Sequence, residues 1–176
     1  VKGGANYNIN EKHNVFANLG YISRAPFFSG GAFLQSTTSN AKNPDPLNEK
    51  VFSAEIGCGF RSGILSVNLN GYYTLWMDKS DVRSSSMANG DYARVNLSGV
   101  DARHMGLELD FVLRPNRWLD VTGMLSLGDW QWDSDSKGYI YDTQGQPLTK
   151  ALDGTVASGI MAEDHAWLNL KQKGIK

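Results

Sequence analysis

The sequence predicts an all-β protein, an antiparallel up-and-down meander that forms part of a transmembrane β-barrel of the outer-membrane type. Three observations predict this fold class. Apolar and polar residues alternate with a period of two over most of the chain, which is typical of strands. Short and long connections alternate, as in a barrel whose turns are all short at one end. The apolar face runs about 9–11 residues per strand, the length that a tilted strand needs to cross a bilayer.

The first pair of strands is expected at residues 1–9 and 14–22, where apolar or small residues alternate with polar ones. A short polar turn near 10–13 connects them. A long segment near 24–50 follows, rich in Ser, Gly, Asn and Pro, and is expected to be an extracellular loop.

The second pair is expected at residues 51–60 and 65–75, joined by a short turn near 61–63. Apolar and polar residues alternate in both segments, with the parity reversed relative to the first pair. The second long extracellular loop is expected near 78–93, where polar and charged residues interrupt the pattern.

The third pair centres on residues 105–113 and 119–127, with a short turn near 114–117. The third long extracellular loop is expected near 133–164. Residues 165–170 then read as a seventh strand in progress. The sequence therefore predicts six to seven strands whose turns are sorted by length.

Aromatic residues lie near both ends of the expected strands, as the two water–lipid interfaces of a membrane favour. The seven residues of this kind are Tyr7, Phe16, Tyr21, Phe60, Trp76, Trp118 and Trp130.

Composition excludes several classes of protein. The formal net charge of −1 argues against a nucleic-acid partner, because such binding is dominated by cationic contacts to phosphates. The single cysteine, Cys58, excludes an internal disulfide framework and a multi-cysteine metal site. The chain of 176 residues begins at Val1 and carries no leader, so we expect it to be a piece of a longer protein. About seven strands cannot close a barrel around so polar an interior, so residues 1–176 are expected to form part of a domain.

Three motifs resemble those of the TonB-dependent outer-membrane receptors. Residues 43–50 (NPDPLNEK) and the Glu55-Ile56-Gly57 strand resemble their "NP-x-L-x-PE-K … E-x-G" signature. Residues 21–26 (YISRAP) resemble the segment that precedes it, and residues 106–110 (GLELD) resemble their "G-x-E-L-E" strand. Asn48 departs from the usual Pro, and the segment before Arg24 is shorter than usual, which leaves the local turn open.

The resemblance implies a barrel of about 22 strands in the outer membrane of a Gram-negative bacterium, closed by a separate plug domain. It implies uptake of a scarce nutrient such as an iron chelate, cobalamin or a glycan, driven through TonB. The expected partners are outer-membrane lipid, a small-molecule or glycan ligand, and the TonB system through a plug domain that we expect to be absent from this chain. A surface lipoprotein partner stays open, and no cofactor is implied.

No constellation of catalytic residues is found, so we do not expect an enzyme. Glu55, Glu108 and Asp110 are expected on the lumen wall, with the last two ion-paired to neighbouring Arg or Lys. No metal site is expected, because Lys137 stands at a ligand position of the calcium-like segment 133–138.

Residues of the long loops and the upper lumen are the candidates for contact with substrate, because aromatic rings suit sugar rings or chelate faces. They are Arg24, Phe27, Phe28, Trp130, Trp132, Tyr139 and Tyr141. Packing within the loops is the competing interpretation for each of these residues. A soluble all-β binding module, such as a carbohydrate-binding or adhesive domain, is the alternative function.

Overall fold

The computed structural model describes residues 1–36, 40–86, 90, 92–148, 159–160 and 166–176. Eleven strands are found in these residues: β1 (Lys2–Asn8), β2 (His13–Arg24), β3 (Phe33–Gln35), β4 (Asn40–Lys42), β5 (Glu49–Arg61), β6 (Leu65–Ser86), β7 (Tyr92–Asn116), β8 (Leu119–Trp132), β9 (Ser136–Tyr141), β10 (Gly159–Ile160) and β11 (Ala166–Leu170). None of the described residues forms a helix long and apolar enough to span a membrane.

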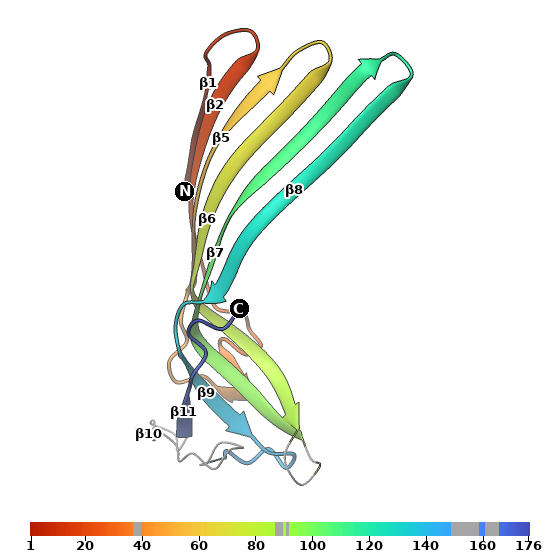
Figure 1. The fold of residues 1–176 in the computed structure, drawn as a ribbon. Helices are drawn as coiled ribbons and strands as arrows, with labels where there is room; N and C mark the ends of the chain where they lie inside the picture. Colours follow the sequence, from red (N-terminus) through yellow and green to blue (C-terminus); the bar gives the residue numbers. More distant parts are fainter. Residues whose placement is uncertain (37–39, 87–89, 91, 149–158, 161–165) are drawn as a thin grey trace.

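Six long strands form one antiparallel sheet in the order β1-β2-β5-β6-β7-β8, with each strand beside its neighbour in the meander. The sheet curves but does not close (Figure 1). The connections at one end are short, and β3, β4, β9, β10 and β11 all lie beyond the other end (Figure 1). This arrangement confirms the all-β antiparallel meander expected from the alternating pattern.

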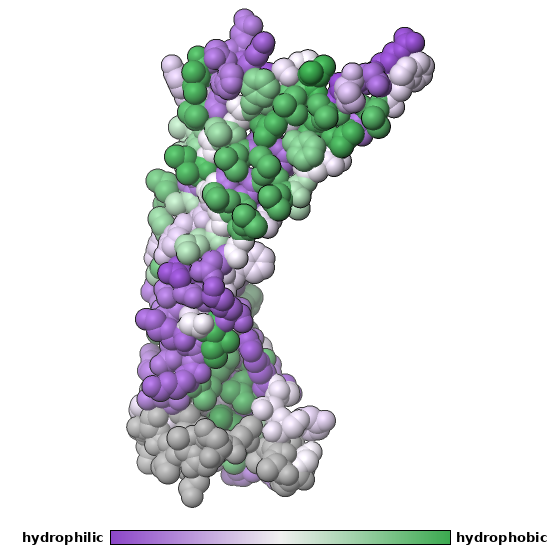
Figure 2. Space-filling view, viewed as in Figure 1, coloured by the Kyte–Doolittle hydropathy of each residue, from purple (hydrophilic) through white to green (hydrophobic). Residues whose placement is uncertain are grey.

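The strand register sorts the side chains onto two faces. One face, here called the apolar face, carries in-register rows such as Leu19-Ala54-Tyr73-Met105 and Val15-Cys58-Leu69-Leu109-Leu125. Many of its side chains are exposed, Leu127 and Leu19 each to 60%. In Figure 2 hydrophobic residues gather over the part of the sheet nearest the short turns, and a hydrophilic zone separates them from the loop end. The other face, here called the polar face, carries mainly Asn, Ser, Glu and Gly.

The aromatic residues divide between these faces. Register places Tyr7, Tyr21 and Phe60 on the apolar face, and Trp118 is exposed to 81% in the turn between β7 and β8. Phe16, Trp76 and Trp130 belong to rows of the polar face. The expectation that all seven aromatic residues lie at lipid interfaces is therefore wrong for these three, because their parity turns them away from the apolar band.

Strands β6 and β7 continue as a paired ribbon well beyond the other strands, to Ser86 and from Tyr92 (Figure 1). The sequence interpretation placed a loop near 78–93, but β6 continues to Ser86. Residues 78–86 are almost all polar, so the alternation of apolar and polar residues that predicts a strand is missing there. The register shifts between Trp76 and Asp81, and Asp78 adopts a positive φ of 57°, as Asp tolerates at a bulge. The bulge marks the junction between the meander and its extension.

Polar contacts hold this junction. The Glu49 carboxylate, 1% exposed, pairs with the Arg24 guanidinium and accepts a hydrogen bond from the Ser80 backbone N–H at 3.2 Å. Lys50 Nζ lies 2.7 Å from Asp78 Oδ2, and the hydrogen bond and charge of Asp78 raise the pKa of Lys50. These contacts join three strands, β2, β5 and β6, at the junction.

Beyond the junction, the loop segments fold into a small packed unit, here called the outer module. Strand β9 pairs with residues 94–98 of β7, β11 pairs with β9, and the β3–β4 hairpin packs beside them. Asn96, fully buried, exchanges two hydrogen bonds with the Gln35 backbone at 2.7 and 2.9 Å and donates to the Tyr139 carbonyl at 3.2 Å. The segments near 24–50 and 133–164, expected as loops, thus contain short strands. Residues 149–158 and 161–165 of the second lie outside the described residues.

Candidate functional site

The polar face carries a network of asparagines and carboxylates. Asn18 donates from Nδ2 to Glu55 Oε2 at 2.9 Å, and Asn70 donates from Nδ2 to Glu55 Oε1 at 3.0 Å and to Glu108 Oε2 at 3.5 Å. These four residues come from β2, β5, β6 and β7, and the strand register brings them together. Each carboxylate is thereby held in place across neighbouring strands.

The same pattern holds one row closer to the short turns, where Asn68 donates to Asp110 Oδ1 at 2.9 Å. Within the described part of the chain, no salt bridge involves Glu55, Glu108 or Asp110. The expectation of Arg or Lys partners for Glu108 and Asp110 is therefore wrong. The cross-strand neighbours of these acids are asparagines, whose N–H groups satisfy carboxylate oxygens without a counter-charge.

A shallow cavity of about 280 Å³ lies over this network. It is lined by Asn18, Ser53, Ala54, Glu55, Asn70, Tyr72, Thr74 and Glu108. Its lining offers hydroxyl, amide and carboxylate groups and no described cation, so it suits an uncharged polar solute better than an anion.

An aromatic corner adjoins the cavity on the side of the outer module. Trp130 donates from Nε1 to the Tyr72 hydroxyl at 3.0 Å, and the His104 ring centroid lies 5.8 Å from that of Trp130. Trp130 stays 59% exposed. Trp132 has the same parity one row further out and is half-buried, with Arg83 5.8 Å above its ring. The structure thus brings the two predicted tryptophans to one face.

The predicted residues of the first loop lie at the junction. Arg24 contacts Glu49 and also sits 4.1 Å above the Phe27 ring. Phe28 is 75% exposed and stacks against Phe33 at 4.6 Å. Because the Arg24 charge is already balanced by a buried carboxylate, this guanidinium is a poor site for a second anion, whereas Phe27 and Phe28 keep exposed surface.

Tyr139 and Tyr141 are separated from these residues. They are 1% and 3% exposed and form the core of the outer module with Leu34, against which Ala41 and Trp167 pack. Burial raises the pKa of Tyr141 to about 12. Their rings have no free face for a ligand, so the structure supports the packing interpretation for this pair.

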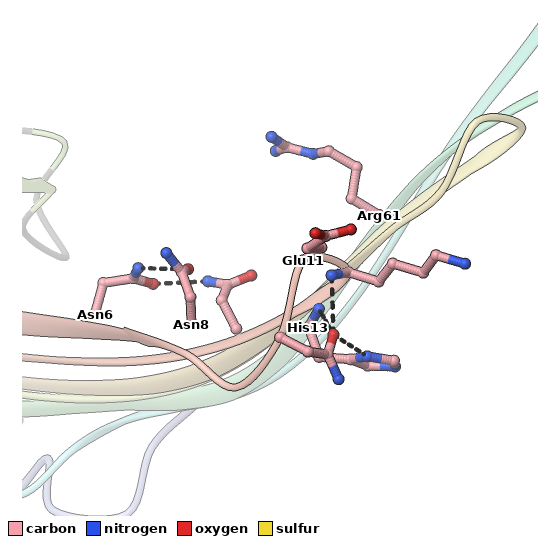
Figure 3. Close-up of a pocket in the computed structure, with 8 residues that line it drawn as sticks. Asn6, Asn8, Glu11, His13 and Arg61 are labelled. Atoms are coloured by element: carbon pink, nitrogen blue, oxygen red, sulfur yellow. Dashed lines mark hydrogen bonds between the residues drawn. The ribbon is translucent and has the colours of Figure 1, made fainter.

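A polar pocket of about 590 Å³ at the short-turn end is a feature that the sequence interpretation missed. Asn10 Oδ1 accepts hydrogen bonds from the backbone N–H groups of Lys12 and His13, both at 2.9 Å, and contacts His13 Nδ1 at 3.0 Å (Figure 3). Asn6 and Asn8 line the same pocket, with Arg61 across from them (Figure 3). The repeated asparagines of this segment were the signal available in the sequence.

The calcium-like segment has other partners. Lys137 Nζ pairs with Asp45 Oδ2 at 3.0 Å. Asp135 Oδ1 accepts backbone hydrogen bonds from Gln172 and Lys173, which lower the pKa of this carboxyl. Among the described residues, no group of three or more His, Cys, Asp or Glu is arranged to hold a metal ion.

Comparison with known proteins identifies the family. The family model described as TonB dependent receptor-like, beta-barrel, matches residues 2–161. Searches of curated proteins and of solved structures found no significant match. The family match covers most of the chain and agrees with the antiparallel meander described above. Proteins of this family are transporters of the Gram-negative outer membrane that work with the TonB system. The chain therefore belongs to the TonB-dependent receptor family, as a segment of its outer-membrane β-barrel.

Proposed function

We propose that this chain forms wall and extracellular rim of an outer-membrane transporter that takes up a scarce nutrient, an iron chelate, cobalamin or a glycan. The observation that carries the proposal is that one and the same stretch of the sheet has an apolar face on one side and a polar face on the other. The apolar rows run from the row of Met105 to the row of Leu113. At about 3.3 Å per residue and a tilt of about 40°, the eight residue steps between these rows span roughly 20 Å, somewhat less than the apolar band of about 25 Å of such barrels.

The outer limit of this band coincides with charged residues on the same face. Arg103 follows Met105 in the outward direction, and its Nη2 lies 3.8 Å from Asp129 Oδ2. Because an ion pair is costly in hydrocarbon, we place the outer lipid boundary near this pair. The outer module then lies outside the membrane and the short turns lie on the periplasmic side.

The polar face lines the lumen in this arrangement. Glu55, Glu108 and Asp110 form part of the lumen wall, where the asparagine network keeps them fixed and solvated. The energy for uptake comes from the proton motive force, which TonB transmits to the plug domain of the receptor. Family membership supports this reading over a soluble binding module, which would have no reason to expose the rows of Leu19 and Leu127.

The ligand-contacting residues proposed here are Trp130 and Trp132 on the polar face and Phe27 and Phe28 at the junction. All four lie at the outer end of the meander, and three of them are more than half exposed. Arg24 acts in this proposal by holding Phe27 and Glu49 in place. Exposed aromatic faces next to a hydrogen-bonding cavity suit ligands with an apolar ring face and a polar rim.

The test is uptake by cells that express the full-length receptor, compared with matched cells that lack it. The probes are a radiolabelled ferric hydroxamate, labelled cyanocobalamin and fluorescent maltoheptaose. We expect receptor-dependent uptake of one of them that stops when the proton motive force is dissipated. Trp130→Ala should weaken the apparent affinity of the receptor for that probe about tenfold, because a few aromatic residues often supply most of the binding energy. Trp118→Ala, at the other end of the barrel, is the control. Uptake that persists without the proton motive force would contradict an energised transporter.

A further inference from the structure

We propose that Tyr72 is a positioning residue that holds the Trp130 indole against the lumen wall, and that Gly106 and Gly128 leave the space in which the Tyr72 and Trp130 side chains meet. The role of Trp130 as a ligand contact rests on the proposed function. The positioning itself rests on the geometry of these four residues.

The glycines form a trough two strands wide. Register pairs Tyr72 of β6 with Gly106 of β7, and Gly106 with Gly128 of β8, so the three residues occupy one row of the polar face. A Cβ atom on Gly106 would meet the Leu127 backbone carbonyl oxygen at 2.4 Å and the Tyr72 hydroxyl oxygen at 2.7 Å. A Cβ atom on Gly128 would lie 3.3 Å from the same oxygen. The tyrosine ring therefore reaches sideways over β7 to the edge of β8. Side chains at positions 106 and 128 would fill this space if these residues were not glycines.

Trp130 is held from three sides. Its Nε1–H donates to the Tyr72 hydroxyl at 3.0 Å, and the His104 ring lies beside it at 5.8 Å and 41°. Below it, a Cβ atom on Gly128 would lie 2.9 Å from Nε1 and 3.2 Å from Cε2, so the indole rests directly on the glycine backbone. Trp130 and Gly128 are two residues apart on one strand and thus share a face.

This arrangement determines which part of the indole surface is exposed to the lumen. The only polar atom of the side chain, Nε1, is occupied by Tyr72, while the residue as a whole remains 59% exposed. The exposed part is then apolar ring surface, next to the hydroxyl and amide groups of the adjoining cavity. Such a surface favours ligands with a flat, uncharged C–H or aromatic face, whether a sugar ring or a chelate ring supplies it.

The test follows Trp130 directly in the full-length receptor labelled with 5-fluorotryptophan. The Trp130 resonance is assigned by its loss in Trp130→Phe. Tyr72→Phe keeps the ring and removes the acceptor, and Gly128→Ala inserts a methyl group under the indole. We expect both variants to move the Trp130 resonance and to raise the population of the indole released from the wall. For Tyr72→Phe, the ratio of released to held indole should rise about fivefold, as expected for the loss of one hydrogen bond between neutral groups.

Two matched variants serve as controls. Tyr73→Phe makes the same change on the neighbouring residue of the apolar face, and Gly63→Ala adds a methyl group where nothing lies within 4 Å. Neither should move the Trp130 resonance. An unchanged resonance in Tyr72→Phe would overturn the positioning role, even if Gly128→Ala failed to assemble.

The uptake probes separate this inference from the function on which it rests. If Trp130→Ala leaves uptake of every probe unchanged, the ligand contact is refuted, although a shifted resonance in Tyr72→Phe still establishes the positioning. If Trp130→Ala lowers uptake and Tyr72→Phe does not move the resonance, the contact stands and the positioning is refuted.

Discussion

Replacing Leu125 by Arg places a cation at the middle of the apolar face. Leu125 lies in the same row as Leu109, four residues along the strand from the row of Val121 and Leu113 at the inner edge of the apolar band. Arg at the bilayer midplane of a transmembrane barrel costs about 2–4 kcal/mol, and the cost falls to about 0–1 kcal/mol near the interfaces. We therefore expect Leu125→Arg to destabilise the folded barrel by about 3 kcal/mol and Val121→Arg by less than about 1 kcal/mol.

Ser126→Arg is the matched control, because Ser126 is the next residue of β8 at almost the same depth and belongs to the polar face with Glu108. Its cost should be close to zero, since the side chain enters the aqueous lumen. The free energy of unfolding is measured by denaturant titration of the full-length receptor refolded into lipid vesicles. Equal losses for Leu125→Arg and Ser126→Arg would refute the assignment of the two faces. A loss for Val121→Arg as large as that for Leu125→Arg would refute the depth assignment.

Three further predictions concern the junction and the outer module. Arg24→Met should destabilise the junction by about 2–4 kcal/mol, because it leaves the buried Glu49 carboxylate with one hydrogen bond. Denaturant titration should show a larger loss in the free energy of unfolding for Arg24→Met than for Glu49→Gln. Asn96→Leu removes three hydrogen bonds and should raise backbone hydrogen exchange in β3 and β4 at least tenfold, with no change in β5. Unchanged exchange in β3 and β4 would contradict the role of Asn96. Tyr141 should stay protonated at pH 11, as absorbance of tyrosinate near 295 nm reports. Because its pKa is raised in the folded state, stability of the outer module should fall from about pH 10 to pH 12, and a normal titration near pH 10 would refute its burial.

Period-two alternation was sufficient to predict the six strands of the meander, because lipid on one side and water on the other impose opposite demands on neighbouring residues. The same reasoning failed for residues 78–86, where β6 continues beyond the apolar rows. Both faces of the ribbon there meet water or the outer module, and the bulge at Asp78 changes the parity. The strands stay paired in this segment through backbone hydrogen bonds. Such bonds do not require any alternation of apolar and polar side chains, so the sequence gives no signal of them.

The candidate site was predicted in part. Parity along β8 gives the shared face of Trp130 and Trp132 from the sequence alone. The burial of Tyr139 could not be read there, because Leu34, its partner in the core, is more than one hundred residues away and belongs to another loop. The contact between Tyr72 and Trp130 also depends on strand register, which a single sequence leaves undetermined until the turns are fixed.

The core of the outer module has a consequence for how such receptors can be diversified or engineered. Its buried side chains form two clusters drawn from three parts of the chain. Leu34, between β2 and β5, packs with Tyr139, after β8, and Ala93, at the start of β7, packs with Ile140. If one of these segments were exchanged for that of another receptor, the remaining buried side chains would lose the residues against which they pack. A functional chimera should therefore transfer all three segments together, with the crossover points placed below the bulge at Asp78.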